Sequence, residues 1–316
     1  MNDILILTDG KAGHENQSKA FARALGGGYE LAEVHFRSKL HKALSYAFDW
    51  LGVHTTSLLR GVPDISRDDG PRAIVGTGSG TFYAAKSLAK RLGAKCGVVL
   101  YPRGYCISTF DCVLSPAFDR PAKAGNVIEI PANLVANDES FYENGVKEFM
   151  RHYRETTKCD LADHPKAVAV IIGGPNKCST MTPEWMKRQL DAIFAANGGD
   201  VEFWVTTSRR TPTDVEKVVD SYPWTYRLLY SRDHFNPIPA FVKLARRLYV
   251  TAESTGMLSE ACTFGTAEVR ALDNLNPGLH KFRRFVDDLR KCGYVDGNRK
   301  VDLSAEFKAA KSLMGL

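Results

Sequence analysis

The stretch that decides the fold is Leu248-Tyr-Val-Thr-Ala-Glu253-Ser254-Thr-Gly256-Met-Leu-Ser259-Glu260-Ala-Cys-Thr-Phe-Gly265. Its apolar start, 248–250, predicts a buried parallel strand, and a polar turn then leads into a helix that ends at Gly265. Ser254 is a good N-cap residue, and the free amides of the first helical turn would form an anion site. Open α/β sheets hold phosphate at this kind of junction. From its place further along the helix, Glu260 would accept hydrogen bonds from the hydroxyl pair of a sugar.

The rest of the chain repeats the order strand, polar loop, helix, which predicts an α/β fold with parallel, doubly wound sheets. Buried strands are expected at 4–7, 73–75, 96–100, 167–172, 201–206, 226–230 and 266–271. The strand at 167–172 restarts the pattern after a polar linker at 158–166 that includes Asp163 and His164. We therefore expect two Rossmann-like domains facing across a cleft, at 1–158 and 166–316, with the last helices free to pack back on the first domain.

Composition places the chain among ordinary globular proteins and excludes several functions. Of 316 residues, 44% are hydrophobic and 25% charged, and the net charge of +6 includes no run of more than two Lys or Arg. This argues against a nucleic-acid partner and is compatible with anionic small ligands or a membrane surface. The seven scattered cysteines lack metal-ligand spacing and favour a reducing compartment. We expect a cytoplasmic protein, with peripheral association with the inner membrane as an alternative.

The loop after the first strand, Asp9-Gly10-Lys11-Ala12-Gly13-His14-Glu15-Asn16-Gln17, carries the candidate catalytic groups. Its two glycines allow close backbone approach, and Lys11, His14 and Gln17 gather polar groups at the mouth of a sheet. The loop matches neither GxGxxG nor a Walker motif. A neutral imidazole suits the deprotonation of a hydroxyl near neutral pH, so His14 or Asp9 is the candidate general base. A simple turn with an exposed histidine is the alternative.

Two loops of the second half predict contacts with phosphate. Gly173-Gly174-Pro175-Asn176-Lys177 follows a strand, and its paired glycines would let a ligand touch the backbone. Ser208-Arg209-Arg210 follows the next strand, where adjacent arginines would form a fork for diphosphate oxygens. A solvated basic turn is the alternative there. Gly76-Thr-Gly78-Ser-Gly80 in the first half is equally compatible with a tight turn and a ligand site.

Other features have ordinary structural explanations. Glu253 is expected to be an acid at the start of a helix, favoured by the helix dipole. It is not expected to form a glycosidase pair with Glu260, because both carboxylates lie in one motif. The aromatic helical segment at 40–59, where Leu40 and Leu44 share a face, is expected in the core. Its basic flanks leave contact with a membrane as the alternative.

Four motifs occur together in this chain: Thr8–Gln17, Gly173-Gly174, Thr206–Pro212 and Val250–Ala261. With them the chain resembles the mitochondrial-fission (elongated-mitochondria) family of plants and its bacterial relatives. The bacterial members are similar to GT-B glycosyltransferases, and distantly to the undecaprenyl N-acetylglucosaminyltransferase of peptidoglycan synthesis. The chain departs from the family pattern at 76–80, where relatives have an Arg-rich turn, and at 265–269, where relatives have Gly-Lys-Pro-Val.

The resemblance implies that the second domain binds a nucleoside-diphosphate sugar as co-substrate and that the first faces the sugar and the acceptor. Gly174 and 208–210 would contact the diphosphate, 254–258 would supply backbone amides, and Glu260 would contact the ribose. The expected donor-binding residues are Gly173, Gly174, Asn176, Ser208, Arg209, Arg210, Glu253, Ser254, Gly256, Met257, Leu258, Ser259 and Glu260. The expected acceptor-side residues are Gly10, Lys11, Gly13 and Gln17, beside the catalytic His14 and Asp9. GT-B enzymes need no bound metal, so neither metal nor cofactor is expected.

We therefore expect a metal-independent glycosyltransferase that moves a sugar from a nucleotide sugar to a lipid-linked or cell-envelope glycan. Two alternatives stay open. One is a non-catalytic adaptor that keeps the fold and recruits a partner. The other is a nucleotide-sugar epimerase, which would act without an acceptor.

Overall fold

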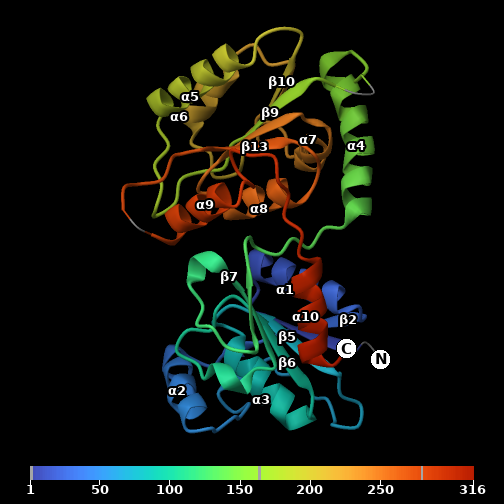
Figure 1. Cartoon of the computed structure of the whole chain (residues 1–316), viewed down its shortest axis with the longest axis vertical. Helices are drawn as coiled ribbons and strands as arrows, with labels where there is room; N and C mark the ends of the chain where they lie inside the picture. Colours follow the sequence, from blue (N-terminus) through green and yellow to red (C-terminus); the bar gives the residue numbers. More distant parts are fainter. Residues whose placement is uncertain (1–2, 163–164, 279) are drawn as a thin grey trace. The chain divides into compact units, whose positions relative to one another are not determined.

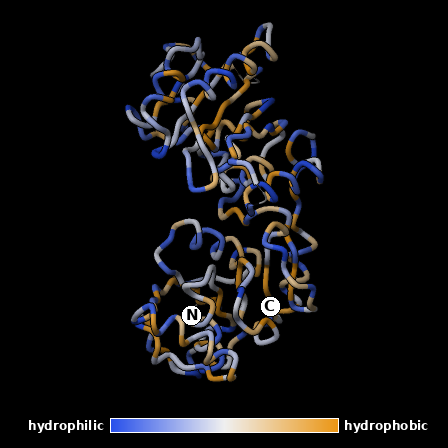
Figure 2. Tube along the Cα trace, turned by 90° about the vertical axis from the view of Figure 1, so that its left-hand side faces the viewer, coloured by the Kyte–Doolittle hydropathy of each residue, from blue (hydrophilic) through white to orange (hydrophobic). Residues whose placement is uncertain are grey.

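A computed structural model describes residues 3–162, 165–278 and 280–316. The chain forms two compact α/β units, one made of Met1–Ala136 with Asp302–Leu316 and the other of Asn137–Val301 (Figure 1). Asp163 and His164, expected in a linker, lie outside the described residues. In Figure 2 hydrophobic and hydrophilic stretches alternate along the chain of each unit, as expected for strands and helices that each bury one side.

The first unit is built on a parallel sheet with the strand order β2-β1-β5-β6-β7-β8. Its strands are β1 (Ile4–Thr8), β2 (Tyr29–Glu33), β5 (Ala73–Thr77), β6 (Lys95–Val99), β7 (Cys112–Pro116) and β8 (Val127–Ile130). Every residue of β1, β5 and β7 is buried, as expected for parallel strands covered on both faces. A short antiparallel pair, β3 (His35–Phe36) and β4 (Leu59–Arg60), brackets α2 (Lys39–Trp50).

Helices cover both faces of this sheet. α1 (Ala12–Leu25) and α10 (Ser304–Met314) contact each other, and α3 (Phe82–Leu92) lies on the opposite face (Figure 1). Successive side chains of a strand point to opposite faces of the sheet. Leu5 and Leu7 pack in the layer that contains α3. Gly97 lies against Phe21 and Met314 in the layer formed by α1 and α10. The final helix therefore completes the core of the first unit.

The second unit has a parallel sheet with the order β11-β10-β9-β12-β13. Its strands are β9 (Ala167–Ile171), β10 (Glu202–Thr206), β11 (Tyr226–Leu228), β12 (Arg247–Thr251) and β13 (Glu268–Leu272). Its helices are α4 (Glu139–Thr157), α5 (Pro183–Ala196), α6 (Thr213–Asp220), α7 (Ile238–Leu244), α8 (Thr255–Thr263) and α9 (Lys281–Lys291). α5 and α6 lie on one face of the sheet, and α4 and α7 on the other (Figure 1).

The helix α4 belongs to the second unit, so the units divide after Ala136 and not at the expected residue 158. The physical reason is the buried aromatic face of α4. The ring of Phe149 lies 5.2, 4.8 and 5.7 Å from the ring centres of Trp204, Tyr226 and Phe241, respectively. Aromatic contacts of this kind add to the energy of apolar burial and fix the helix on this sheet.

Each sheet reverses its winding at one point. In the first unit, the connection after β1 runs to β2 on one side and the connection after β5 runs to β6 on the other. In the second unit the same reversal occurs between β9 and β12. Ligands of doubly wound sheets bind outside the carboxyl ends of the strands at such switch points. The loops after these four strands are therefore the first place to look for a site.

The orientation of α2 is opposite to the one expected. The helix spans Lys39–Trp50, and its leucines face solvent while Ser45 and Asp49 are buried. The Asp49 carboxylate accepts hydrogen bonds from Lys86 Nζ at 2.7 and 2.9 Å, and the Lys86 ammonium also donates to the carbonyl of Cys106 at 2.7 Å. This buried ion pair, and not apolar packing alone, fixes which side of α2 points inward. In the described residues, no helix combines the length and the apolar character needed to cross a bilayer.

We predict that Asp49→Ala lowers the free energy of unfolding by about 3–5 kcal/mol, because it leaves the Lys86 ammonium buried without its partner. Urea unfolding followed by circular dichroism measures the change. Lys19→Ala is the control, because it breaks the solvent-accessible Lys19–Glu15 pair on α1 and should cost less than about 0.5 kcal/mol. A loss below about 1 kcal/mol for Asp49→Ala would contradict this account of α2.

Candidate functional site

Hydrogen bonds join three loops at the carboxyl edge of the second sheet. The amide of Gly173, after β9, donates to Thr251 Oγ1 at the end of β12, at 2.8 Å. The hydroxyl of Thr211, in the loop after β10, donates to the Gly173 carbonyl at 2.6 Å. The loops predicted to bind phosphate are thus brought together at the switch point between β9 and β12.

The paired glycines of this site are required by neighbouring protein atoms. A Cβ on Gly173 would lie 2.2 Å from Glu253 Oε1, and one on Gly174 would lie 2.2 Å from the carbonyl oxygen of Arg210. Both distances are far below van der Waals contact. The groups that approach these glycines are the protein's own Glu253 and Arg210, and the predicted contact with a ligand stays a prediction.

Glu253 is a buried carboxylate of the site and not an acid in the first turn of α8, which begins at Thr255. It accepts hydrogen bonds from the Thr251 hydroxyl at 3.0 Å and from Asn274 Nδ2 at 2.7 Å. Burial raises the pKa of the Glu253 carboxyl, against the opposing effect of these hydrogen bonds and of the charge of Arg210. The sequence gives no warning of Asn274, since it lies beyond the end of the next strand.

Positive charge lies beside this buried carboxylate. Arg209 and Arg210 are exposed, and within the residues that the structure describes neither guanidinium forms an ion pair. Their loop is held by Ser208, whose amide donates to Thr211 Oγ1 at 2.9 Å and whose hydroxyl accepts from the Arg210 amide at 3.2 Å. Two adjacent guanidinium groups on a fixed turn are suited to bind an anion with two or more oxygens.

The N-terminus of α8 adds amides to this positive region. Ser254 is the N-cap residue, as predicted, but its side chain makes no capping hydrogen bond. Its own amide donates to the Thr251 carbonyl at 3.2 Å. The first-turn amides that follow, including those of Gly256 and Met257, have no acceptor within the helix. They can therefore bind an anion, which the helix dipole would favour.

Several predicted donor-binding side chains make contacts inside the protein. Leu258 is fully buried, and the Ser259 hydroxyl donates to the Thr255 carbonyl at 2.7 Å. Asn176 Oδ1 accepts from the Cys178 amide at 2.8 Å and closes a turn. Glu260 Oε1 accepts from the Tyr142 hydroxyl at 2.9 Å, and burial raises the pKa of the Glu260 carboxyl against the effect of that bond.

The first unit holds an acid–imidazole pair at its own switch point. Asp9 follows β1, and its two carboxylate oxygens lie 3.1 and 3.2 Å from Nδ1 of His14, in the first turn of α1. Burial works to raise the pKa of Asp9, but the hydrogen bond from Lys11 and the charges of Lys11 and His14 outweigh it and lower that pKa. An ionised Asp9 accepts the Nδ1 proton, which leaves Nε2 of a neutral imidazole free to take up another.

The glycine-rich turn after β5 packs against this pair. Gly78 has a φ of +82°, and a Cβ there would lie 2.4 Å from Cε1 of His14. A Cβ on Gly80 would lie 2.8 Å from Cβ of Asp9. Close contact with the Asp9–His14 pair therefore explains the glycines of this turn. The sequence alone is equally compatible with a tight turn and with a ligand site here.

The other predicted acceptor-side residues line the same end of α1. Gly10 has a φ of +78°, which allows the sharp turn out of β1, and Gly13 faces open space. Gln17 donates to the Gly13 carbonyl at 3.5 Å, while its buried Oε1 has no hydrogen-bond partner among the described residues. An unsatisfied buried amide oxygen of this kind is uncommon.

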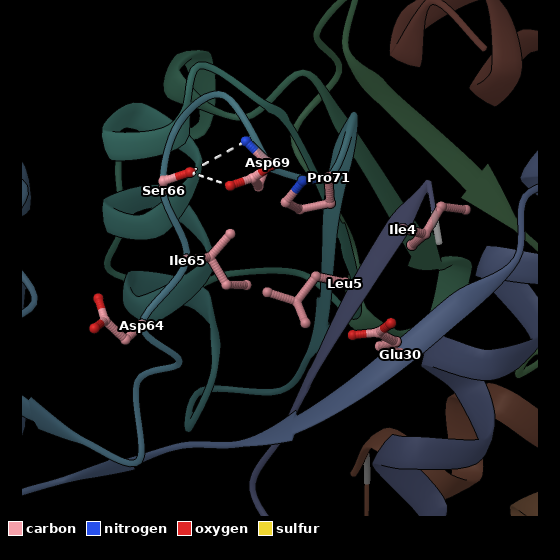
Figure 3. A pocket seen from close by; sticks show the side chains of 8 residues that line it. All are labelled: Ile4, Leu5, Glu30, Asp64, Ile65, Ser66, Asp69 and Pro71. Atoms are coloured by element: carbon pink, nitrogen blue, oxygen red, sulfur yellow. Dashed lines mark hydrogen bonds between the residues drawn. The ribbon is translucent and has the colours of Figure 1, made fainter. Parts of the chain in front are cut away.

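A cavity of about 300 Å³ lies elsewhere in the first unit. Ile4 and Leu5, at the amino end of β1, line it together with Ile65 and with Ser66, whose hydroxyl donates to Asp69 at 2.8 Å (Figure 3). Because it lies at the amino ends of the strands, it is at the wrong edge of the sheet for a switch-point ligand. Among the described residues, no group of three or more His, Cys, Asp and Glu side chains is placed to hold a metal ion.

The two parallel sheets, each wound in both directions, define a protein of the GT-B class, and this predicted fold class is confirmed. The sequence matches the family described as mitochondrial fission ELM1 over residues 12–309, so the chain belongs to that family, and the predicted resemblance is confirmed. Comparison with curated proteins gives no significant match.

Solved structures share the fold. The UDP-GlcNAc 2-epimerase from Neisseria meningitidis, bound to UDP-GlcNAc, is similar with a TM-score of 0.51 and 9% identity over 99% of this chain and 97% of the epimerase. The UDP-GlcNAc 2-epimerase from Methanocaldococcus jannaschii has a TM-score of 0.48 and 11% identity over the same shares of the two chains. At 9% identity, the likeness to the Neisseria structure shows the fold alone.

We predict that Gly174→Ala lowers the free energy of unfolding by about 1–3 kcal/mol, because its methyl group would overlap the Arg210 carbonyl and displace the arginine loop. Gly256→Ala is the matched control, since a Cβ there meets nothing within 4 Å. It should leave stability unchanged or slightly higher. Urea unfolding of both variants measures the difference, and equal stabilities would contradict the close approach of the two loops.

A pH-dependent prediction follows from the raised pKa of Glu253. An ordinary glutamate carboxyl titrates near pH 4.3. Between that pH and the higher native pKa of Glu253, the folded protein binds the Glu253 proton more tightly than the unfolded chain does. The contribution of Glu253 to stability therefore falls as pH rises through its native pKa. Glu253→Gln removes the ionisation, so the free energy of unfolding of the variant should rise relative to that of the wild type as pH increases. Urea titrations over a pH series test this, and a difference that does not vary with pH would contradict it.

Proposed function

We propose that this protein is a GT-B-type glycosyltransferase that uses a nucleoside-diphosphate sugar and needs no metal ion. The observation that carries the proposal is the pair of exposed guanidinium groups, Arg209 and Arg210, which form no ion pair with any described residue. Their loop and Glu253, which precedes α8, both approach the glycine pair at 173–174. A diphosphate leaving group develops negative charge as its bond to the sugar breaks. Fixed guanidinium groups and helix amides stabilise such charge without reorganisation, which is the role a metal ion has in other transferases.

The Asp9–His14 pair supplies the second chemical requirement. In the proposed step, Nε2 of His14 removes the proton of the acceptor hydroxyl while the oxygen forms a bond to the anomeric carbon. The bond from that carbon to the diphosphate breaks, and its electron pair leaves with the nucleotide. Asp9 orients the imidazole and stabilises its positive charge. Attack from the face opposite the leaving group inverts the anomeric carbon.

A lipid-linked or cell-envelope glycan is proposed as the acceptor because the sequence motifs resemble those of bacterial GT-B glycosyltransferases. The choice of donor is supported by the Neisseria epimerase of the same fold, whose structure contains UDP-GlcNAc. Contact of Glu260 with the ribose stays a prediction. Glu260 Oε1 already accepts from Tyr142, so Oε2 has the greater capacity left for a ribose hydroxyl.

Titration calorimetry with UDP, GDP, CMP and their sugars tests the donor site. We predict that one nucleoside diphosphate binds the wild type, and that Arg209→Ala or Arg210→Ala weakens it about 10- to 150-fold, the equivalent of a charge-assisted hydrogen bond. Arg188→Ala, at an exposed arginine of α5, is the control and should bind like the wild type. Failure of every nucleotide to bind would contradict the enzyme proposal and favour the adaptor.

His14→Ala separates the remaining alternatives. If the protein is a transferase, the His14→Ala variant should bind the nucleotide sugar as the wild type does, and its transfer rate should fall about 10²- to 10⁴-fold. Conversion of the nucleotide sugar by the wild type with no acceptor present, followed by nuclear magnetic resonance of the sugar, would instead identify an epimerase.

A further inference from the structure

Helix α2 presents an apolar face to solvent. We use the name α2 face for Leu40, Leu44, Trp50, Leu51 and Val53, which are 66, 38, 83, 64 and 44% exposed. The exposed Ala43 and Ala47 continue the stripe along the helix. These five make up most of the large hydrophobic side chains exposed in the described parts of the chain. Isolated exposed leucines are ordinary, but a cluster of this kind on one short segment indicates an interaction surface.

The inward side of α2 shows why this face cannot turn into the core. The Ser45 hydroxyl lies 2.9 Å from the hydroxyl of Tyr105, and Asp49 forms the buried ion pair with Lys86. Rotating the helix to bury Leu40 and Trp50 would break both contacts and expose an ion pair built for the interior. The apolar stripe is therefore held outward by polar contacts on the opposite side.

The charge around the α2 face has one sign. Between residues 37 and 60 the basic residues are Arg37, Lys39, Lys42 and Arg60, while the single acidic residue is Asp49, which is buried and neutralised. Arg37 donates to the Ser57 carbonyl at 2.9 Å, and Lys42 to the Ser79 hydroxyl at 2.9 Å. These bonds fix Arg37 and Lys42 through neutral oxygens, and neither side chain forms an ion pair within the described residues.

A polar groove of about 510 Å³ lies beside the α2 face. Arg37, Arg60 and Arg91 line it together with the Thr55–Ser57 segment, which comes shortly after the end of α2. Asp64 lines the same groove, so an anion would bind next to the three arginines and away from Asp64. Three guanidinium groups and a run of hydroxyls are the groups that bind a phosphate.

We propose that the α2 face docks this protein on an anionic lipid surface, with Trp50 and Leu51 in the acyl boundary and a headgroup phosphate in the arginine groove. An amphipathic helix with Trp and Leu on one side and basic residues at its edge lies in the membrane interface in this way. A second copy of the chain does not fit, since it would bring the same positive rim against this one. The proposal concerns a partner surface and does not depend on whether the chain transfers a sugar.

Flotation with vesicles tests the proposal on the full chain. The wild type should bind vesicles of phosphatidylcholine with phosphatidylglycerol at least tenfold more tightly than vesicles of phosphatidylcholine alone, and added salt should weaken that binding. Leu51→Glu and Arg60→Glu should each reduce it at least tenfold. The matched control is Leu31→Glu, at a 44% exposed leucine on β2, which should bind like the wild type.

Tryptophan emission gives a second readout. Vesicles should shift the emission of the wild type to shorter wavelength, and Trp50→Phe should remove this shift while keeping most of the binding. Equal binding by Leu51→Glu and the wild type, or no preference for the anionic vesicles, would overturn the proposal. Sedimentation in which the wild type self-associates and Leu51→Glu does not would overturn it in favour of a second copy.

Discussion

The structure depends on one constraint of parallel sheets, the close approach of loops where the winding reverses. At these points two neighbouring strands end side by side while their chains leave in opposite directions. The loops there pack closely, which Gly173 allows beside Glu253 in one unit and Gly78 and Gly80 allow beside His14 and Asp9 in the other. The same contacts that the fold requires also gather the polar side chains, so the fold and the candidate site have one origin.

Much of this architecture could be predicted because a buried parallel strand shows in the sequence as a short apolar run. The run at 167–172 became β9, and the run at 4–7 became β1. What the sequence could not show is which sheet a helix packs on. The aromatic residues of α4 find their partners, Trp204 and Phe241, far along the chain. For the same reason α2 was expected in the core: its apolar spacing is identical whether that face is buried or exposed, and the Asp49–Lys86 pair that decides between them is a tertiary contact.

The candidate site was predictable to the level of loops and no further. Strand-end position and residue type were enough to select Asp9, His14 and the arginine pair. They were not enough to assign Glu253, whose environment is set by Thr251 and by Asn274 on another loop. Hydrogen-bond partners of this kind are chosen by packing between segments. A residue that is only an acid near a helix in the sequence thereby becomes a buried carboxylate with a raised pKa.

The placement of Glu253 also bears on how the second unit would treat an anion. The buried Glu253 carboxylate interacts electrostatically with Arg210, so a diphosphate would have to compete with Glu253 for the same guanidinium. The cost is limited because burial raises the pKa of Glu253, so its carboxyl takes up a proton more readily than an exposed one when a second negative charge arrives. Within the part of the chain that the structure describes, Arg209 forms no ion pair, so its charge would be available to an anion. The adjacent arginines are therefore unequal, because Arg210 lies in the field of the buried acid Glu253 whereas Arg209 is open to solvent.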